Sequence, residues 1–95
     1  MARYVSLVRF TEQGARAIKK STRRAQAFRK AAEKAGVKVE AQYWTVGAYD
    51  GVMILSADQE AKVLQLITSL ATAGNVRTES LRALDETEFT ALVGK

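Results

Sequence analysis

Residues 42–55 read QYWTVGAYDGVMIL. The two ends of this stretch, residues 42–46 and 52–55, are rich in aromatic and β-branched side chains, which is typical of strands. Between them lies Gly47-Ala48-Tyr49-Asp50-Gly51, a segment bracketed by glycines that predicts a turn. We therefore expect a β-hairpin here. Its tip, which has an aromatic and an acidic residue, is the first candidate for a functional site.

Hydrophobic periodicity on the N-terminal side of the hairpin predicts three further elements. Residues 3–10 are mostly apolar and predict a strand, and residues 37–43 alternate apolar with polar side chains, as a half-buried strand does. Between them, an apolar stripe at helical spacing predicts a helix. That helix is expected to begin at Ser21 as N-cap and to end at Gly36.

On the C-terminal side of the hairpin, residues 52–57 complete the third strand. Asp58 is expected to cap a second helix that runs to about residue 73, and residues 76–84 predict a fourth strand. Asp85 and Glu88 are spaced as in a capping box and predict a short last helix. We expect this helix to cover part of the exposed apolar surface.

The predicted order β-α-β-β-α-β plus a terminal helix indicates an α+β, ferredoxin-like fold with a four-stranded antiparallel sheet. The right-handed crossover rule places strands 3–10 and 52–57 in the centre of the sheet. Both central strands are apolar on both faces, although two helices can cover only one face. Since an open antiparallel sheet is usually polar on its second face, we expect a second copy of the chain to cover it, in a homodimer or a larger assembly.

Composition limits the classes of function. The chain has 95 residues, so we expect residues 1–95 to form a single domain. It has no cysteine and no histidine, which removes disulfides, thiolate chemistry, the commonest general base and the commonest metal ligand. We expect no metal and no cofactor. Because no apolar run approaches the roughly 20 residues that span a bilayer, and because the N-terminus does not resemble a signal peptide, we expect a cytoplasmic protein.

Positive charge is concentrated in one segment. Nine basic residues and a single acid, Glu33, lie between Arg16 and Lys38, whereas residues 39–95 have four basic and eight acidic residues. A basic helix is one feature of nucleic-acid-binding proteins. Such faces more commonly meet solvent or an acidic surface of another copy, so we do not expect nucleic acid as the partner.

Five stretches of this chain resemble the GYD domain family: Tyr4-Val5-Ser6-Leu7, Phe10-Thr11-Glu12-Gln13-Gly14, Ala25-Gln26-Ala27-Phe28, Tyr43-Trp44-Thr45-Val46-Gly47-Ala48-Tyr49-Asp50 and Gly74-Asn75-Val76-Arg77-Thr78. The resemblance spans almost the whole chain. It implies the dimeric α/β-barrel superfamily, in which two ferredoxin-like sheets pack face to face. Members of that superfamily include cofactor-free quinone-type monooxygenases, haem-degrading enzymes and small-molecule sensors.

The ligand-binding candidates are six residues near the hairpin and near the start of the fourth strand: Tyr43, Trp44, Tyr49, Asp50, Asn75 and Arg77. Gly47 and Gly51 are expected to serve the geometry of the turn. Tyr43 and Trp44 point to opposite faces of a strand, so at most one of them lines a given pocket. Arg77 suits a carboxylate or phosphate, but an intersubunit salt bridge to Asp50 or Glu79 explains it equally well.

Three function classes remain open. The first is a small oligomeric domain that binds or senses a small molecule. The second is a cofactor-independent monooxygenase or isomerase acting on an aromatic or quinone-like ligand, with Tyr49 as proton donor and Asp50 as base. The third is RNA binding, which is disfavoured because strand 52–57 lacks the aromatic residues that stack on bases. No catalytic residue is assigned, and the absence of histidine and cysteine favours binding.

Overall fold

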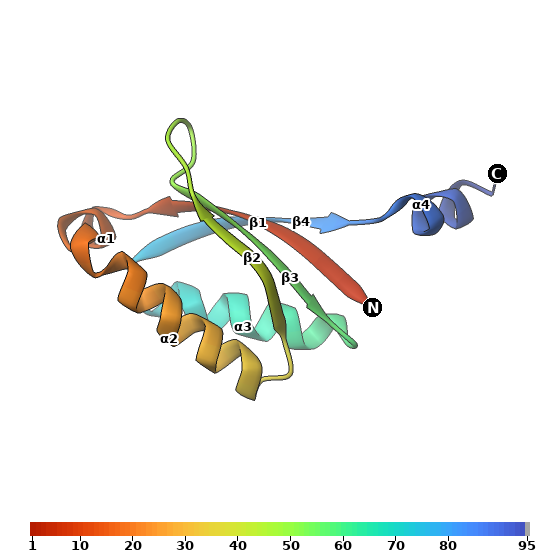
Figure 1. The fold of residues 1–95 in the computed structure, drawn as a ribbon, viewed down its shortest axis with the longest axis horizontal. Helices are drawn as coiled ribbons and strands as arrows, with labels where there is room; N and C mark the ends of the chain where they lie inside the picture. Colours follow the sequence, from red (N-terminus) through yellow and green to blue (C-terminus); the bar gives the residue numbers. More distant parts are fainter. Residues whose placement is uncertain (95) are drawn as a thin grey trace.

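A computed structural model describes residues 1–94 of the chain (Figure 1). The elements run in the order β1 (Ala2–Phe10), α1 (Glu12–Arg16), the short 3-10 helix η1 (Ile18–Lys20), α2 (Ser21–Lys34), β2 (Lys38–Trp44), β3 (Gly51–Ala57), α3 (Glu60–Thr72), β4 (Val76–Ala83) and α4 (Glu86–Val93). The predicted ferredoxin-like α+β order is confirmed.

The four strands form one antiparallel sheet in the order β2-β3-β1-β4, with β1 and β3 in the centre as predicted. The register pairs Tyr4 with Leu55 and Val5 with Ile54 across the two central strands. A bulge at Glu40 shifts the pairing of β2 with β3. Because side chains alternate along a strand, this register fixes which residues face the helices and which face away.

Helices α2 and α3 cover the same face of the sheet (Figure 1). Between the helices and the sheet lies the hydrophobic core, which has Leu55 and Val63 at its centre, fully buried. Its other members come from both layers: Ala2, Tyr4, Val8, Phe28, Ala32, Val37, Met53, Ala57 and Leu66.

The opposite face of the sheet has no covering element among residues 1–94, and we call it the open face. Its centre is apolar, formed by Val5 and Leu7 of β1 and by Val52 and Ile54 of β3, which are only partly buried. Leu81 of β4, which pairs with Val5, is 47% exposed. The predicted apolar character of both faces is therefore present in the single chain.

Helix α4 does not cover the open face, so that expectation was wrong. The helix continues past the end of β4 (Figure 1), and it reaches β1 through Glu88, whose Oε1 lies 3.7 Å from Arg3 Nη1. It has the predicted capping box, in which Asp85 and Glu88 each accept a hydrogen bond from the other's backbone N–H. The spacing of Asp85 and Glu88 correctly predicted where the helix begins. It does not predict where the helix packs, because packing depends on residues far away in the sequence.

Two predicted helix caps were also wrong. The N-cap of α2 is Lys20, and Ser21 is the first helical residue, whose hydroxyl bonds elsewhere. The N-cap of α3 is Gln59, whereas the Asp58 carboxylate lies 3.0 Å from Lys62 Nζ in an i, i+4 pair. In both cases a tertiary or side-chain partner competes with the backbone N–H groups. Within residues 1–94, no helix has the length and apolar character that a membrane crossing requires.

Candidate functional site

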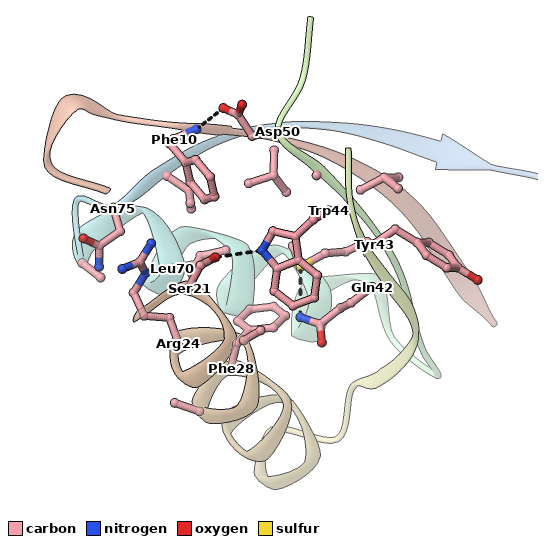
Figure 2. Close-up of a pocket in the computed structure, with 18 of the residues that line it drawn as sticks. Phe10, Ser21, Arg24, Phe28, Gln42, Tyr43, Trp44, Asp50, Leu70 and Asn75 are labelled. Carbon is pink, nitrogen blue, oxygen red and sulfur yellow. Dashed lines mark hydrogen bonds between the residues drawn. The ribbon is translucent and has the colours of Figure 1, made fainter. Parts of the chain in front are cut away.

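A cavity of about 380 Å³ lies between the sheet and helices α2 and α3 (Figure 2). Most of its lining is apolar and comes from all these elements: Val8, Phe10, Ala25, Ala27, Phe28, Ala31, Met53, Leu66, Leu70, Ala73 and Val76. Ser21, Arg24, Gln42, Trp44, Asp50, Ser69 and Asn75 add polar groups to the lining. Apolar walls with a few polar groups are the usual composition of small-molecule sites.

Trp44 connects the end of β2 to helix α2. Its indole Nε1 donates a hydrogen bond of 2.8 Å to the hydroxyl of Ser21, and its ring lies over the cavity (Figure 2). The side chain remains 50% exposed. Trp44 therefore forms a wall between the cavity and solvent, and it is the only tryptophan in the sequence.

Asp50 lies where the hairpin rejoins the central strands. Its Oδ2 accepts a hydrogen bond of 2.8 Å from the backbone N–H of Phe10, and its own N–H donates to the carbonyl of Val8 at 2.8 Å. The Thr45 N–H donates to the Asp50 carbonyl at 2.9 Å. The bonds to Phe10 and Val8 attach the hairpin to β1, and the bond from Thr45 closes the hairpin, so Asp50 has a structural role in addition to its place on the cavity wall.

Asn75 and Arg24 lie at the same end of the cavity as Asp50 (Figure 2). The Asn75 side-chain oxygen accepts from Gln13 Nε2 at 3.0 Å, and its backbone carbonyl accepts from the Thr11 N–H at 3.0 Å. Arg24 donates to the Ala17 carbonyl at 2.9 Å. The cavity thus has a carboxylate, an amide and a guanidinium near one end, each positioned by its own hydrogen bonds.

Tyr49 and Arg77 do not line this cavity, because they lie on the open face. The Tyr49 hydroxyl donates to Glu79 Oε1 at 3.0 Å, and the Arg9 guanidinium carbon lies 4.6 Å from the centre of the Tyr49 ring. Arg77 is directly opposite Arg9 in the register of β1 and β4. Among residues 1–94, no ion pair joins Arg77 to Asp50 or Glu79.

Three of the six candidates therefore come together at the cavity: Trp44, Asp50 and Asn75. Tyr43 borders it, but its ring points away (Figure 2) and is 63% exposed on the open face. Tyr43 and Trp44 point to opposite faces, as predicted. Gly47 lies in the hairpin with a positive φ of 143°, and Gly51 begins β3 opposite Trp44.

Sequence reasoning missed the contribution of α2 to the cavity. Ser21, Ala25 and Phe28 follow one another at i, i+4 and i+7, which places them on one side of a helix, and Arg24 precedes Ala25. Part of this spacing served only to predict a buried stripe. The small side chains on this helix, Ala25, Ala27 and Ala31, are a signal that could have indicated a cavity, because they leave space between the helix and the sheet.

A second polar cluster lies apart from the cavity. The hydroxyl of the buried Tyr4 donates to Glu60, and Arg82 Nε lies 3.9 Å from the same carboxylate. Hydrogen bonding to Glu60, followed by burial, raises the pKa of Tyr4 above its usual value of 10.0. Since neither Tyr4 nor Glu60 borders the cavity, we assign this cluster to the attachment of α3 to the sheet.

The comparisons with known proteins agree with this fold. The sequence model of the GYD domain family matches residues 4–93 of this chain. A "glutamine synthetase and cystathionine beta-lyase binding protein" from Thermus thermophilus is 32% identical over 92 residues, which cover 96% of this chain and 97% of that protein. A crystal structure from the same organism aligns with a TM-score of 0.56 and 24% identity over 90% of this chain and 95% of that one, which supports the fold alone. The chain described here belongs to the GYD domain family.

Proposed function

We propose that this protein is a small binding protein that holds a mainly apolar, aromatic molecule in the cavity between the sheet and helices α2 and α3. The observation that carries the proposal is the cavity itself. Its volume of about 380 Å³ falls in the range of about 300–1,000 Å³ that is typical of ligand pockets. An aromatic ring of the ligand would pack against Phe28 and Trp44.

The polar groups at one end of the cavity support a ligand with at least one polar substituent. Arg24 and Asn75 can donate hydrogen bonds, and the Asp50 carboxylate can accept one in addition to that from Phe10. A few convergent polar groups orient a ligand whose affinity comes mainly from apolar contact.

The alternative, a cofactor-independent monooxygenase or isomerase, receives less support from this geometry. One arrangement of such a site has Tyr49 as donor and Asp50 as base at the mouth of a pocket. In the single chain these residues face opposite sides of the sheet, since Tyr49 bonds to Glu79 on the open face and Asp50 borders the cavity. Binding is therefore the function that the arrangement of residues favours.

Trp44 provides a direct test, because the only tryptophan reports on the cavity. We expect native mass spectrometry of the purified protein to detect a bound small molecule. Titration with 1,4-naphthoquinone or 1-naphthol as probes should change the fluorescence of Trp44 and saturate at one site per chain.

The matched variants are Ala25→Phe, which fills the cavity from α2, and Arg23→Phe, which places the same ring on the exposed side of that helix. We expect Ala25→Phe to abolish the saturable change and Arg23→Phe to retain it. Equal responses of both variants, or no saturable response of the unmodified protein to either probe, would contradict the proposal.

A second candidate function is the binding of metabolic enzymes, which is favoured by the name of the Thermus relative. In this account the protein would bind glutamine synthetase or cystathionine β-lyase through an exposed surface. Size-exclusion chromatography of the chain mixed with the glutamine synthetase and with the cystathionine β-lyase of its own organism tests this, with the relative and its enzymes as a positive control. Independent elution of the chain from both enzymes would argue against this candidate.

The protein also acts as a homodimer in this proposal. The support is the open face, where Val5, Leu7, Val52 and Ile54 form a contiguous apolar surface. Each large side chain that is removed from water contributes about 1.5–3 kcal/mol. A two-fold axis would bury this set twice, once in each copy.

A further inference from the structure

Two arginines lie directly opposite each other on the open face. Arg9 of β1 is the register partner of Arg77 of β4. Like charges directly opposite in an antiparallel pair are destabilising. Neither guanidinium makes an ion pair with an acidic residue among residues 1–94. The repulsion between these two arginines lowers the stability of the single chain, and an anion bound beside them would remove that cost.

Glu79, two residues after Arg77 on β4, forms no ion pair with either arginine within residues 1–94. Glu79 accepts the hydroxyl of Tyr49 at 3.0 Å, and the Tyr49 ring lies against Arg9, 4.6 Å from its guanidinium carbon. The hairpin thereby holds Arg9 in place without neutralising it. The register thus places two positive charges on one face, at the end of an apolar surface, and such a pair suits a carboxylate.

Helix α4 has the complementary properties. Its first turn has the acidic residues Glu86 and Glu88, it has no basic residue in its last turn, and Phe89 and Leu92 are 54% and 70% exposed. A helix of eight residues is marginal in water without tertiary contacts. The exposed apolar residues indicate that α4 packs against a surface that the single chain does not supply.

The chain's own α4 is poorly placed to reach the arginine pair. Arg77 is at the start of β4, and α4 follows its other end (Figure 1). The six residue steps from Arg77 to Ala83 span roughly 20 Å of extended strand. A two-fold axis that lies between two open faces and runs across the strands reverses one β4 relative to the other, and so places the α4 of one copy at the end of the sheet where the arginine pair of the other lies.

We propose that α4 of a second copy docks at the edge of the open face, with Glu86 paired to Arg9 and Arg77 and with Phe89 against the neighbouring apolar side chains. Of the two glutamates in the first turn of α4, Glu86 is the one available for this pair, because Glu88 accepts the capping-box hydrogen bond and lies 3.7 Å from Arg3. The inference rests on the proposed homodimer and adds the element that each copy exchanges. Each copy supplies one acidic helix and one arginine pair, so the contacts form twice and the assembly closes.

Charge reversal tests this pairing. The variants Arg77→Glu and Glu86→Lys should each raise the dimer dissociation constant at least about tenfold, and the double variant should recover most of that loss, because it restores opposite charges. Analytical ultracentrifugation gives the constants, and circular dichroism checks that each variant is folded. The control is Glu33→Lys, an exposed reversal on α2 that should leave the constant unchanged.

The absence of native cysteine allows a second measurement that does not depend on charge. A Phe89→Cys chain mixed with a Leu7→Cys chain should form a disulfide-linked pair, whereas a mixture with a Lys30→Cys chain, on the exposed side of α2, should not. A dimer whose affinity is unaffected by both charge reversals, with no preferential disulfide, would overturn the exchange of α4 and leave the homodimer standing. A monomer at about 10 μM would overturn both. A loss of affinity on Arg77→Glu that Glu86→Lys does not reverse would assign the arginine pair to a different anion and reject α4 as its occupant.

Discussion

Gly14 lies at a close approach between two distant parts of the chain. It lies in α1, and a Cβ there would overlap the backbone carbonyl oxygen of Asn75. The same carbonyl accepts the Thr11 N–H, so the contact joins α1 to the loop before β4. Replacing glycine by alanine within a helix usually stabilises it by up to about 1 kcal/mol. At Gly14 the added Cβ would force the loop at Asn75 to move, and the cost of that movement is larger than the helical gain.

We therefore expect Gly14→Ala to lower the free energy of unfolding by about 2–3 kcal/mol. Gly47→Ala is the comparison, because its Cβ would meet no atom within 4 Å and only its φ of 143° disfavours a side chain. That change should cost about 1 kcal/mol. Urea denaturation measures both values, and a Gly14→Ala variant as stable as the unmodified protein would contradict the close approach.

Tyr4 gives a prediction about pH. Because hydrogen bonding to Glu60 and burial raise its folded-state pKa above 10.0, the folded protein retains this proton more tightly than the unfolded chain. The resulting stabilisation is complete below the unfolded-state pKa and is lost as pH rises through the folded-state pKa. Tyr4→Phe lacks this contribution.

The Tyr4→Phe variant should be less stable than the unmodified protein by about 1–2 kcal/mol at about pH 8. The difference should shrink at about pH 11, which lies above the pKa of a tyrosine in the unfolded chain. Urea denaturation at the two pH values checks this. Tyr43→Phe is the control for the removal of a tyrosine hydroxyl, since that side chain is exposed.

At the scale of elements, Asp50 and Arg77 lie on different parts of the sheet and should act independently. Asp50→Ala removes the acceptor of the Phe10 N–H, which should cost about 1.5–3 kcal/mol because the acceptor is charged. In a double-mutant cycle with Arg77→Met, the two changes should add within about 0.5 kcal/mol. A coupling well above that value, measured by chemical denaturation, would indicate an ion pair between them.

The elements themselves were largely predictable, because their signals are local. Alternation identified β2, the apolar runs identified β1 and β3, and the spacing of Asp85 and Glu88 identified the start of α4. The caps of α2 and α3 were not predictable, because Ser21 bonds to Trp44, 23 residues away, and Asp58 pairs with Lys62. When a side chain can bond either to a helix N-terminus or to another side chain, the sequence alone does not show which bond forms.

The candidate site was only partly predictable for a related reason. Strand periodicity separated Tyr43 from Trp44, since neighbouring residues face opposite sides. Tyr49 is in a turn, where no periodicity defines a face, and only its contacts with Arg9 and Glu79 place it on the open face. The contribution of Arg24 depends on the packing of α2 against the sheet.

At the scale of the whole molecule, the two faces of the sheet have different expected roles. The covered face encloses the cavity, and its ligand would contact α2 and α3. The open face has an apolar centre with a charged margin that includes Arg9, Arg77 and Glu79. Binding of a ligand and pairing of two copies therefore use opposite sides of the sheet, so each can be disrupted separately.

Ile54→Lys tests this separation, because Ile54 lies in the centre of the open face on β3. We expect the unmodified protein to sediment as a dimer at about 10 μM. The lysine would be removed from water twice in a two-fold dimer, so the dissociation constant should rise at least about a hundredfold. The Trp44 response to an aromatic probe should remain, since the cavity is on the other face.

Val46→Lys is the matched control, because Val46 is fully exposed at the hairpin and lies outside the open face. It should leave the sedimentation unchanged. If Ile54→Lys remains dimeric, the open face is not the surface that joins two copies, and the apolar pair of central strands requires another partner. If Ile54→Lys becomes monomeric and also loses the Trp44 response while remaining folded by circular dichroism, the two faces are coupled, and the cavity depends on the second copy for its shape.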